Sequence, residues 1–388
     1  MRAGGRTAAA LALVVALGAA AVACAPERGP ASSPTEAPSA TPTAPPTPVD
    51  PIAALTLEQR VGQLFMVGTS VRGADPVTIS AIVDRHAGSI FLHGRSQAGA
   101  AATAALVRSF TSLVGPATTA GVPLWVATDQ EGGEVQVLQG PGFDRMPSAL
   151  SQSALPDLEK QGETWGSQLS QVGVNMDLAP VADIVTSPGA ARANPPIGAL
   201  NREYGFDQAS VAAHAGAFAE GMRSAGVVPT FKHFPGLGRV GGNTDFDAGI
   251  VDDTVTADAP DVDVYRQLTS HGVSAVMLST AVYQRIDPSV PAVFSKAIVT
   301  DLLRGKVGFD GVVMTDDVSA TAQMKAWSPA DRAIQSIQAG VDVVLVSADP
   351  RVYAPMYDAV LAKAKADPVF AKQVDDAARR VVEAKARS

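Results

Sequence analysis

The feature of this sequence that most constrains its fold is a regular alternation of short apolar runs with longer helical segments. From residue 51 onward, runs rich in valine, isoleucine, leucine and phenylalanine recur between stretches of helical period. This alternation is typical of parallel strands joined by crossover helices. The eight runs are "GQLFMVG" (62–68), "GSIFL" (88–92), "PLWVATD" (123–129), "VNMDLAP" (174–180), "VVPTFKHF" (227–234), "SAVMLST" (274–280), "GVVMTDD" (311–317) and "VDVVLVS" (341–347).

The segments between the runs have the composition of helices. Residues 207–226 and 329–340 are rich in alanine, carry spaced apolar residues and end in glycine. Eight units of this kind predict a (β/α)8 barrel. The competing architecture is a doubly wound open sheet. No run is followed by a G-x-G-x-x-G or Walker-type phosphate loop, which argues against the nucleotide-binding form of that competitor.

The composition limits the class of partner. The chain has 388 residues, of which 46% are hydrophobic, so it can bury a large core. Its formal net charge is -8 and it contains no long basic run, so it lacks the electrostatic footprint of a nucleic-acid-binding protein. We therefore exclude nucleic acid as a partner and expect a monomer.

The first 23 residues have the pattern of an export signal. Arg2 and Arg6 precede the apolar run "TAAALALVVALGAAAVA", which ends in small residues and is short for a membrane span. Cys24 follows at once and is the only cysteine in the chain, which excludes an intramolecular disulfide and a multi-cysteine metal site. Its position resembles that of the acylated cysteine of bacterial lipoproteins. The alternative is an ordinary secreted protein cut at an A-x-A-like site.

Residues 24–50 are expected to be a tether. They consist almost entirely of proline, alanine, serine and threonine, and have too few large apolar groups to offset the entropy of folding. The predicted organisation is therefore a signal peptide (1–23), a tether (24–50) and one folded domain (51–388). A lipid on Cys24 would hold that domain at the extracytoplasmic face of the membrane.

The barrel prediction places chemistry at the carboxyl ends of the strands, where the βα loops form the active face. Charged side chains do lie within or at the ends of these runs: Asp129, Asp177, Lys232, His233, Asp316 and Asp317. A single aspartate here is weak information, because aspartate commonly begins a turn or caps a helix. A carboxylate, a Lys-His pair and an Asp-Gln-Glu that meet in one cleft suit sugar chemistry.

Six motifs of this chain resemble, in order, those of glycoside hydrolase family 3, in its β-N-acetylglucosaminidase branch. They are "DQEGG" (129–133), "NMDLAPVADI" (175–184), "IGALNREYG" (197–205), "KHFPGLG" (232–238), "VVMTDDVSA" (312–320) and "AGVDVVLV" (339–346). The resemblance implies a TIM-like barrel and a retaining exo-glycosidase. It implies a carbohydrate substrate, terminal β-linked N-acetylglucosamine of cell-wall-derived glycans or muropeptides.

The resemblance also implies roles for individual residues. Asp316 corresponds to the nucleophile that forms the glycosyl-enzyme intermediate, and Asp317 to a supporting residue. Asp129, Arg202, Lys232 and His233 correspond to residues that hold sugar hydroxyls, for which charged partners make strong hydrogen bonds. Such a double displacement needs carboxylates and water, so we expect no metal and no organic cofactor.

The sequence departs from the branch where the acid/base is expected. The branch reads K-H-F-P-G-H-G followed by D-x-H, whereas this chain has Leu237 in the first motif and a longer loop with Asp245 and Asp247. A carboxylic acid can replace histidine as the general acid if burial or a like charge raises its pKa. We predict Asp245 as the acid/base or its orienting partner, and Asp247 as the next candidate.

Further departures leave other functions open. Glu134 and Val137 stand where the branch tends to have arginines, and Thr280 stands where it often has a histidine. One alternative is a glycan-binding surface lipoprotein with impaired catalysis. Another is a related glycosidase or phosphorylase for a different β-linked sugar.

Overall fold

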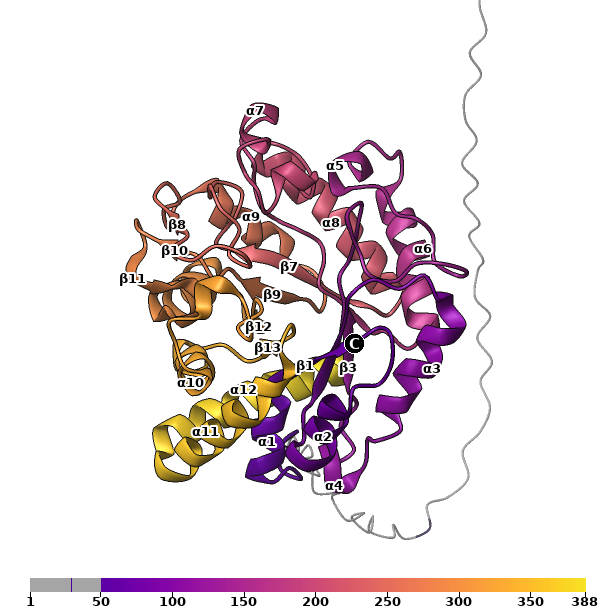
Figure 1. Cartoon of the computed structure of the whole chain (residues 1–388), viewed down its shortest axis with the longest axis vertical. Helices are drawn as coiled ribbons and strands as arrows, with labels where there is room; N and C mark the ends of the chain where they lie inside the picture. The colour runs from indigo at the N-terminus through magenta and orange to yellow at the C-terminus, as the bar shows by residue number, and fades with distance from the viewer. Residues whose placement is uncertain (1–28, 30–49) are drawn as a thin grey trace, which may run out of the picture. The chain divides into compact units, whose positions relative to one another are not determined.

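A computed structural model describes residue 29 and residues 50–388, and residues 49–388 form one compact unit. Eight parallel strands stand side by side in the order β12-β9-β7-β6-β3-β2-β1-β13 (Figure 1). A bridge between Met314 of β12 and Val343, which precedes β13, joins the two ends of this row. The strands are β1 (Phe65–Ser70), β2 (Ser89–His93), β3 (Trp125–Thr128), β6 (Met176–Asp177), β7 (Val228–Phe234), β9 (Ala275–Leu278), β12 (Val312–Thr315) and β13 (Val344–Val346).

This arrangement is the predicted (β/α)8 barrel, and each of the eight apolar runs overlaps one of its strands. The first apolar run differs from the prediction at its start, because residues 62 and 63 are the last two residues of a helix. Thr56 caps that helix, accepting a hydrogen bond from the Gln59 backbone N–H, while the Gln59 side chain bonds back to the Thr56 backbone. The strand therefore begins only at Phe65.

Helices surround the strands. They are α1 (Leu57–Gln63), α2 (Pro76–Arg85), α3 (Gly99–Thr111), α4 (Pro116–Thr119), α5 (Ala149–Gln152), α6 (Leu158–Gln171), α7 (Pro188–Ala191), α8 (Gln208–Ser224), α9 (Pro260–Leu268), α10 (Pro329–Ala339), α11 (Tyr353–Ala366) and α12 (Pro368–Arg387), with the π-helix η3 (Ala297–Val307). The segments predicted as helical at 207–226 and 329–340 correspond to α8 and α10. Gly340 ends α10 with a φ of 109°, a conformation that glycine adopts without strain.

The loops contain additional short strands and helical turns. They are the hairpin β4 (Gln130–Gly132) and β5 (Val135–Gln136), the three-stranded sheet of β8 (Val251–Asp252), β10 (Val282–Tyr283) and β11 (Asp287–Pro291), and the turns η1 (Gly198–Leu200), η2 (Ala292–Phe294), η4 (Ala322–Met324) and η5 (Pro350–Val352). Both the hairpin and the three-stranded sheet belong to loops that follow barrel strands, on the face where a site is expected.

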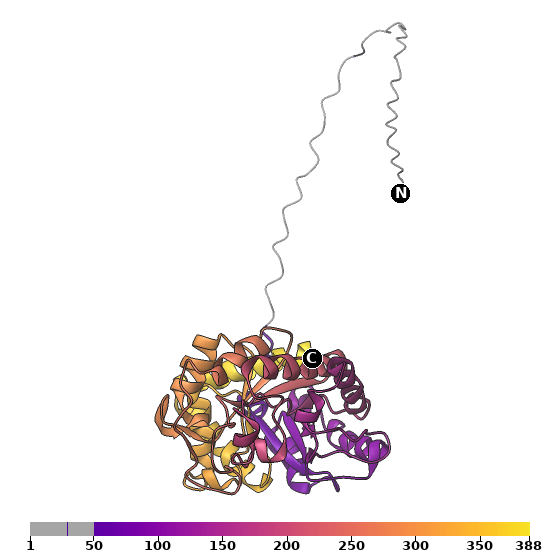
Figure 2. The same cartoon turned by 90° about the horizontal axis from the view of Figure 1, so that it is seen from above.

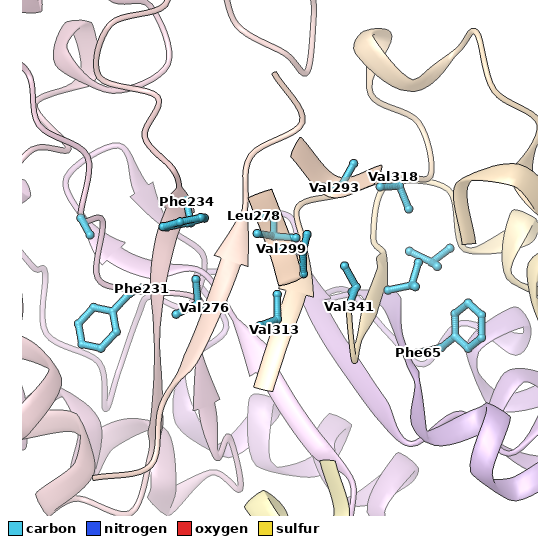
Figure 3. Close-up of a cluster of buried hydrophobic side chains, with 14 of the residues drawn as sticks. Phe65, Phe231, Phe234, Val276, Leu278, Val293, Val299, Val313, Val318 and Val341 are labelled. Carbon is cyan, nitrogen blue, oxygen red and sulfur yellow. The ribbon is translucent and has the colours of Figure 1, made fainter. Parts of the chain in front are cut away.

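Apolar side chains pack on both surfaces of the barrel wall. Figure 3 shows the outer layer, in which Phe231, Val276 and Val313 of three adjacent strands lie beside Val299 of η3. The inner layer is a separate cluster that includes Trp125, Met277 and Met314. Because successive residues of a strand point to opposite faces, one apolar run supplies both layers.

Helix α12 covers the amino end of the barrel. Its Val381 and Ala384 belong to the inner cluster, and Figure 2, the view from above, shows the C-terminus among the helices at one edge of the domain. The opposite, carboxyl end is left for the loops. No helix in the described part of the chain combines the length and apolarity that a membrane span requires.

Candidate active site

A cavity of about 440 Å³ opens at the carboxyl ends of the barrel strands. Its lining brings together residues that are far apart in the sequence but follow neighbouring strands, as parallel strands in a barrel require. Six of the seven residues predicted to act in catalysis or sugar binding line this one cavity: Asp129, Arg202, Lys232, His233, Asp245 and Asp316. The seventh, Asp247, is not part of the lining.

The floor of the cavity holds a network of four charged side chains. Lys232 Nζ lies 2.7 Å from both Asp129 Oδ1 and Glu131 Oε1. Arg202 binds Glu131 with two parallel hydrogen bonds, each 2.7 Å long, from Nε and Nη2. The Asp129 side chain remains 28% exposed, whereas Lys232 and Glu131 are each only 3% exposed. Asp129 therefore offers an oxygen to a ligand, and the other two groups fix its position.

Burial and charge act in opposite directions on the pKa values in this network. Burial by itself would raise the pKa of Glu131, but the charges of Arg202 and Lys232 hold that pKa at about 2. Burial by itself would lower the pKa of Lys232, but Asp129 and Glu131 raise it above its ordinary value. Glu131 and Lys232 therefore both stay charged at neutral pH, which keeps the ion pair between them.

His233 is oriented by a second carboxylate. Its Nδ1 lies 2.8 Å from Asp183 Oδ2, and its backbone N–H donates to Asp183 Oδ1 at 3.2 Å. The same Oδ1 accepts the Leu237 N–H at 2.7 Å. Because a carboxylate only accepts here, Nδ1 carries the proton and Nε2 is the ring nitrogen left for the cavity.

Asp316 follows β12 directly. Its backbone N–H donates to Leu278 O, and its Oδ1 accepts the Asp317 backbone N–H at 2.8 Å. Burial raises the pKa of Asp316, and the neighbouring His233 and Lys232 act against that rise. Asp317 has a different environment: its carboxylate accepts from the Ser319 backbone and hydroxyl and from the Ser347 N–H. Asp317 thereby joins the loop after β12 to the loop after β13.

The loop that follows β7 brings one of its two aspartates into the cavity. The Asp245 carbonyl accepts the Ala322 N–H, and the Thr244 carbonyl accepts the Gln323 N–H. These bonds hold the loop against the segment after β12, so Asp245 lines the cavity together with Asp316. Asp247 instead accepts the Asn243 N–H through Oδ2 at 3.1 Å and does not line the cavity, although both aspartates are exposed. The structure thus separates the two candidates for the acid/base.

The pKa of Asp245 is raised to about 6. The first cause is loss of hydration, because protein atoms of the cavity wall surround a side chain that still reaches solvent. The second cause is repulsion from the carboxylates of Asp316 and Asp317. Burial therefore raises the pKa of both carboxyl groups of the cavity, Asp245 and Asp316.

Sequence reasoning did not assign roles to three further acids that build this site: Glu131, Asp177 and Asp183. Glu131 lies two residues after Asp129 in an extended segment, so both can face the same side, a spacing that was available as a signal. Asp177 is fully buried and accepts the Gln130 N–H at 2.9 Å, and burial raises its pKa to about 8. No comparable spacing in the sequence pointed to Asp183, because only the fold brings its side chain close to His233.

The first glycine of "DQEGG" also has a structural reason. Gly132 has a φ of 99°, and a Cβ built on it would lie 2.2 Å from Pro147 O. The tight turn between β4 and β5 keeps Glu131 beneath Arg202. Cys24 lies outside the described residues, and within those residues no group of three or more His, Cys, Asp or Glu side chains is placed to hold a metal ion.

Comparison with known proteins identifies the family. The family model described as the N-terminal domain of glycosyl hydrolase family 3 matches residues 56–384. Among curated proteins, a β-hexosaminidase of Nitrosomonas eutropha is 31% identical over 297 residues, which cover 74% of this chain and 80% of the relative. The β-hexosaminidase LpqI of Mycobacterium tuberculosis is 34% identical over 240 residues, 58% of each chain.

Solved structures agree. A β-N-acetylhexosaminidase from Beutenbergia cavernae superposes with a TM-score of 0.85 at 59% identity, covering 86% of this chain and 99% of that chain. A family 3 β-N-acetylglucosaminidase from Paenibacillus superposes with a TM-score of 0.78 at 32% identity, covering 86% of this chain and 62% of that one. With the family match extending over nearly all of the barrel, this chain belongs to glycosyl hydrolase family 3.

Proposed function

We propose that this protein is a β-N-acetylhexosaminidase that hydrolyses terminal β-linked N-acetylglucosamine with retention of configuration. Family membership and the named relatives support glycoside hydrolysis and the hexosamine substrate. The observation that carries the residue assignment is the meeting of Asp316, Asp245 and the Asp129–Lys232 pair in one cavity. A nucleophile, an acid and hydroxyl-binding groups are the parts that retaining hydrolysis needs.

The first step is displacement at the anomeric carbon. The ionised carboxylate of Asp316 forms a bond to that carbon while the bond to the glycosidic oxygen breaks. Asp245, whose raised pKa favours the protonated form, gives its proton to the departing oxygen. This step leaves a sugar ester on Asp316 and an ionised Asp245.

The second step reverses these roles. Asp245 removes a proton from a water molecule, whose oxygen bonds to the anomeric carbon as the bond to Asp316 breaks. The two displacements restore the original configuration and return both carboxyl groups to their starting states. Throughout, Asp129, Arg202, Lys232 and His233 hold the hydroxyl groups of the sugar, since all four line the cavity with charged or polar atoms.

The test of this assignment is turnover of an aryl β-N-acetylglucosaminide. We expect Asp316→Ala to lower kcat by roughly four or more orders of magnitude, because the covalent route is lost. Asp310→Ala is the matched control, since Asp310 is exposed just before the same strand. Mass spectrometry of the wild type with a slow fluorinated glycoside should place the added sugar on the peptide that contains Asp316.

Three results would contradict the proposal. Activity of Asp316→Ala near that of the wild type would remove the nucleophile, and a sugar found on another residue would replace it. Turnover that requires inorganic phosphate, with a sugar phosphate as the product, would indicate a phosphorylase instead. A panel of other aryl β-glycosides in the same assay measures the preference for the 2-acetamido group.

We propose further that the enzyme is a lipoprotein acting on cell-wall-derived glycans at the extracytoplasmic face. Support comes from the sequence alone: an export signal, the single cysteine at position 24 and a Pro-rich segment before the barrel. Cys24→Ser should abolish incorporation of a labelled fatty acid. Incorporation that persists in this variant would contradict the anchor.

A further inference from the structure

Phe246 is an exposed aromatic residue in the lining of the active-site cavity. It is 80% exposed, and the other large apolar residues exposed in the described part of the chain are four valines. A single exposed apolar residue on a protein surface needs no explanation, but an exposed ring at a polar cavity does. Phe246 lines the same cavity as Asp316 and Asp245, and it directly follows Asp245 in the chain.

The position of Phe246 differs from that of the other large apolar side chains of the cavity lining. Those side chains are almost completely buried, and most lie in or directly after barrel strands: Phe91, Leu178, Leu237, Met277 and Leu345. They form the inner wall around a sugar that enters the barrel mouth. Most of the surface of Phe246 reaches solvent, so this ring stands at the entrance of the cavity.

Hydrogen bonds hold the backbone that carries the ring. The Phe246 N–H donates to Asn243 O at 3.1 Å, and the carbonyl of the preceding residue accepts the Ala322 N–H at 3.0 Å. Farther along the loop, the Gln323 side chain bonds to both the N–H and the carbonyl of Ile250. The loop is therefore fastened to the segment after β12 at two places. When a ligand covers the ring, only its two side-chain torsions remain to be ordered.

The proton donor determines on which side of the sugar the leaving group lies. Asp245 must reach the glycosidic oxygen, which is the first atom of the leaving group. The opposite edge of the terminal sugar is held by Asp129, which follows β3, four places from β12 in the ring of strands. Phe246 adjoins Asp245 and not Asp129, so the ring is next to the leaving group and outside the space of the terminal sugar.

The chemistry of an exposed phenyl ring indicates which leaving groups it favours. A pyranose with equatorial substituents carries its axial C–H bonds on its two faces, which makes those faces flat and apolar. The face of an aromatic ring is electron-rich and attracts such C–H groups. A small alcohol does not have this flat surface and gains little from the ring.

We propose that Phe246 is the platform on which the leaving sugar stacks, so that the enzyme selects glycosides whose leaving group is itself a pyranose. The inference rests on the proposed function and names its substrate class, β-linked oligosaccharides. The enzyme still releases one terminal sugar at a time. Phe246 takes no part in making or breaking bonds, and it determines which leaving groups are bound well beside Asp245 before the first displacement.

The experiment compares kcat/KM for two substrates, the β-1,4-linked disaccharide of N-acetylglucosamine and methyl β-N-acetylglucosaminide. The terminal sugar is the same in both, and neither leaving group is activated. We expect Phe246→Ala to lower kcat/KM for the disaccharide by about tenfold and to leave that for the methyl glycoside within about twofold of wild type.

Further variants separate stacking from bulk. Phe246→Tyr keeps a ring and should retain the preference for the disaccharide, whereas Phe246→Leu keeps an apolar side chain without a ring and should lose most of it. Val251→Ala is the matched control, because Val251 is an exposed apolar residue of the same loop region that does not line the cavity. A Phe246→Leu variant with the full preference would contradict stacking.

A structural role of Phe246 in placing Asp245 would give different results. Equal losses on both substrates would overturn the platform. So would a shift of the alkaline limb, expected near pH 6, in the pH profile of Phe246→Ala with the methyl glycoside. We expect that limb to stay in place. Urea unfolding of Phe246→Ala should match the wild type, because the residue is exposed.

A binding measurement tests the platform independently of turnover. Calorimetry with the Asp316→Ala variant should show the disaccharide binding more tightly than the methyl glycoside, and Phe246→Ala in that background should remove the difference. Equal affinities in Asp316→Ala would overturn the platform while leaving the proposed function intact. A wild type that hydrolyses neither substrate would overturn the proposed function, and the two affinities would then decide the platform by themselves.

Discussion

The barrel carries a buried lysine at each end, and the two lysines have opposite electrostatic environments. At the carboxyl end, Lys232 is 3% exposed and lies between two carboxylates. At the amino end, Lys385 of α12 is 7% exposed, and its Nζ donates to Gln63 Oε1 at 2.8 Å and Gly88 O at 2.6 Å. Its Nζ also lies 5.5 Å from the centre of the Trp125 ring.

The pKa values show what the difference means. Burial lowers the pKa of Lys385 to about 7, because its partners are neutral. Burial acts on Lys232 in the same direction, but the two carboxylates outweigh it and raise the pKa. One end of the barrel thus holds an ammonium ion that is paired with two carboxylates at the candidate site. The other holds a lysine whose charge changes near neutral pH.

The largest effect is expected from breaking the pair at the carboxyl end. Lys232→Met leaves Asp129 without a partner and Glu131 with Arg202 alone. We expect a loss of about 3–5 kcal/mol in the free energy of unfolding, and kcat/KM lower by roughly a thousandfold. Urea unfolding and turnover of the aryl glycoside measure the two losses. Lys232→Arg keeps the charge and serves as the control. A Lys232→Met variant with wild-type stability would contradict a shared network.

A smaller effect, which concerns the rate of reaction and not the stability, is expected for Asp245 in the loop that follows β7. Asp245 must be protonated to act as an acid, so kcat/KM should fall as pH rises through about 6. Asp245→Asn should remove this alkaline limb. It should also slow sugar leaving groups by about a hundredfold or more, and activated aryl leaving groups much less.

Asp247→Asn is the matched control for this prediction, because Asp247 lies on the same loop outside the cavity lining. We expect its pH profile to follow that of the wild type. If Asp247→Asn loses the alkaline limb and Asp245→Asn retains it, the two roles must be exchanged.

The smallest effect is expected at the amino end and concerns stability alone. Between about pH 7 and pH 10.5 the unfolded chain holds a proton on Lys385 that the folded chain lacks. The free energy of unfolding therefore rises with pH across this interval, by at most about 1.4 kcal/mol per pH unit. Lys385→Met should flatten this rise between pH 7 and 9.5, with activity unchanged. Chemical denaturation measures the slope.

Lys372→Met is the control for Lys385→Met, because Lys372 is an exposed lysine of the same helix. Its slope should match that of the wild type. A Lys385→Met variant with an undiminished slope would show that another group titrates in this interval.

The sequence predicted the barrel because the apolar runs that indicate its strands can be recognised from consecutive residues. Each of the eight apolar runs overlaps a strand, and burial on both faces of a barrel wall demands such runs. The start of β1 was less visible, since Gly62 and Gln63 fit either a strand or the end of α1. The capping box at Thr56 stabilises helix α1 and not the strand, and Gly62 and Gln63 belong to that helix.

The site could be predicted as a set of residues, but their partners could not. Lys232 and Asp129 stand at strand ends and were expected to meet. Glu131 completes their network and binds Arg202, which is 71 positions away in the chain. Asp183 orients His233, which is 50 positions away. No periodicity records such contacts, because they follow from how strands are placed around the ring.

By itself, the sequence determined the architecture, the family motifs and the presence of two acids in the loop after Lys232 and His233. Only the tertiary structure distinguishes these two acids, since Asp245 and Asp247 differ by two positions and not in chemistry, and Asp245 alone lines the cavity. The bonds from Ala322 and Gln323 hold the loop so that one carboxyl enters the cavity and the other bonds to Asn243. The physical reason is general: a pKa depends on neighbouring charges and lost water, and the fold supplies both.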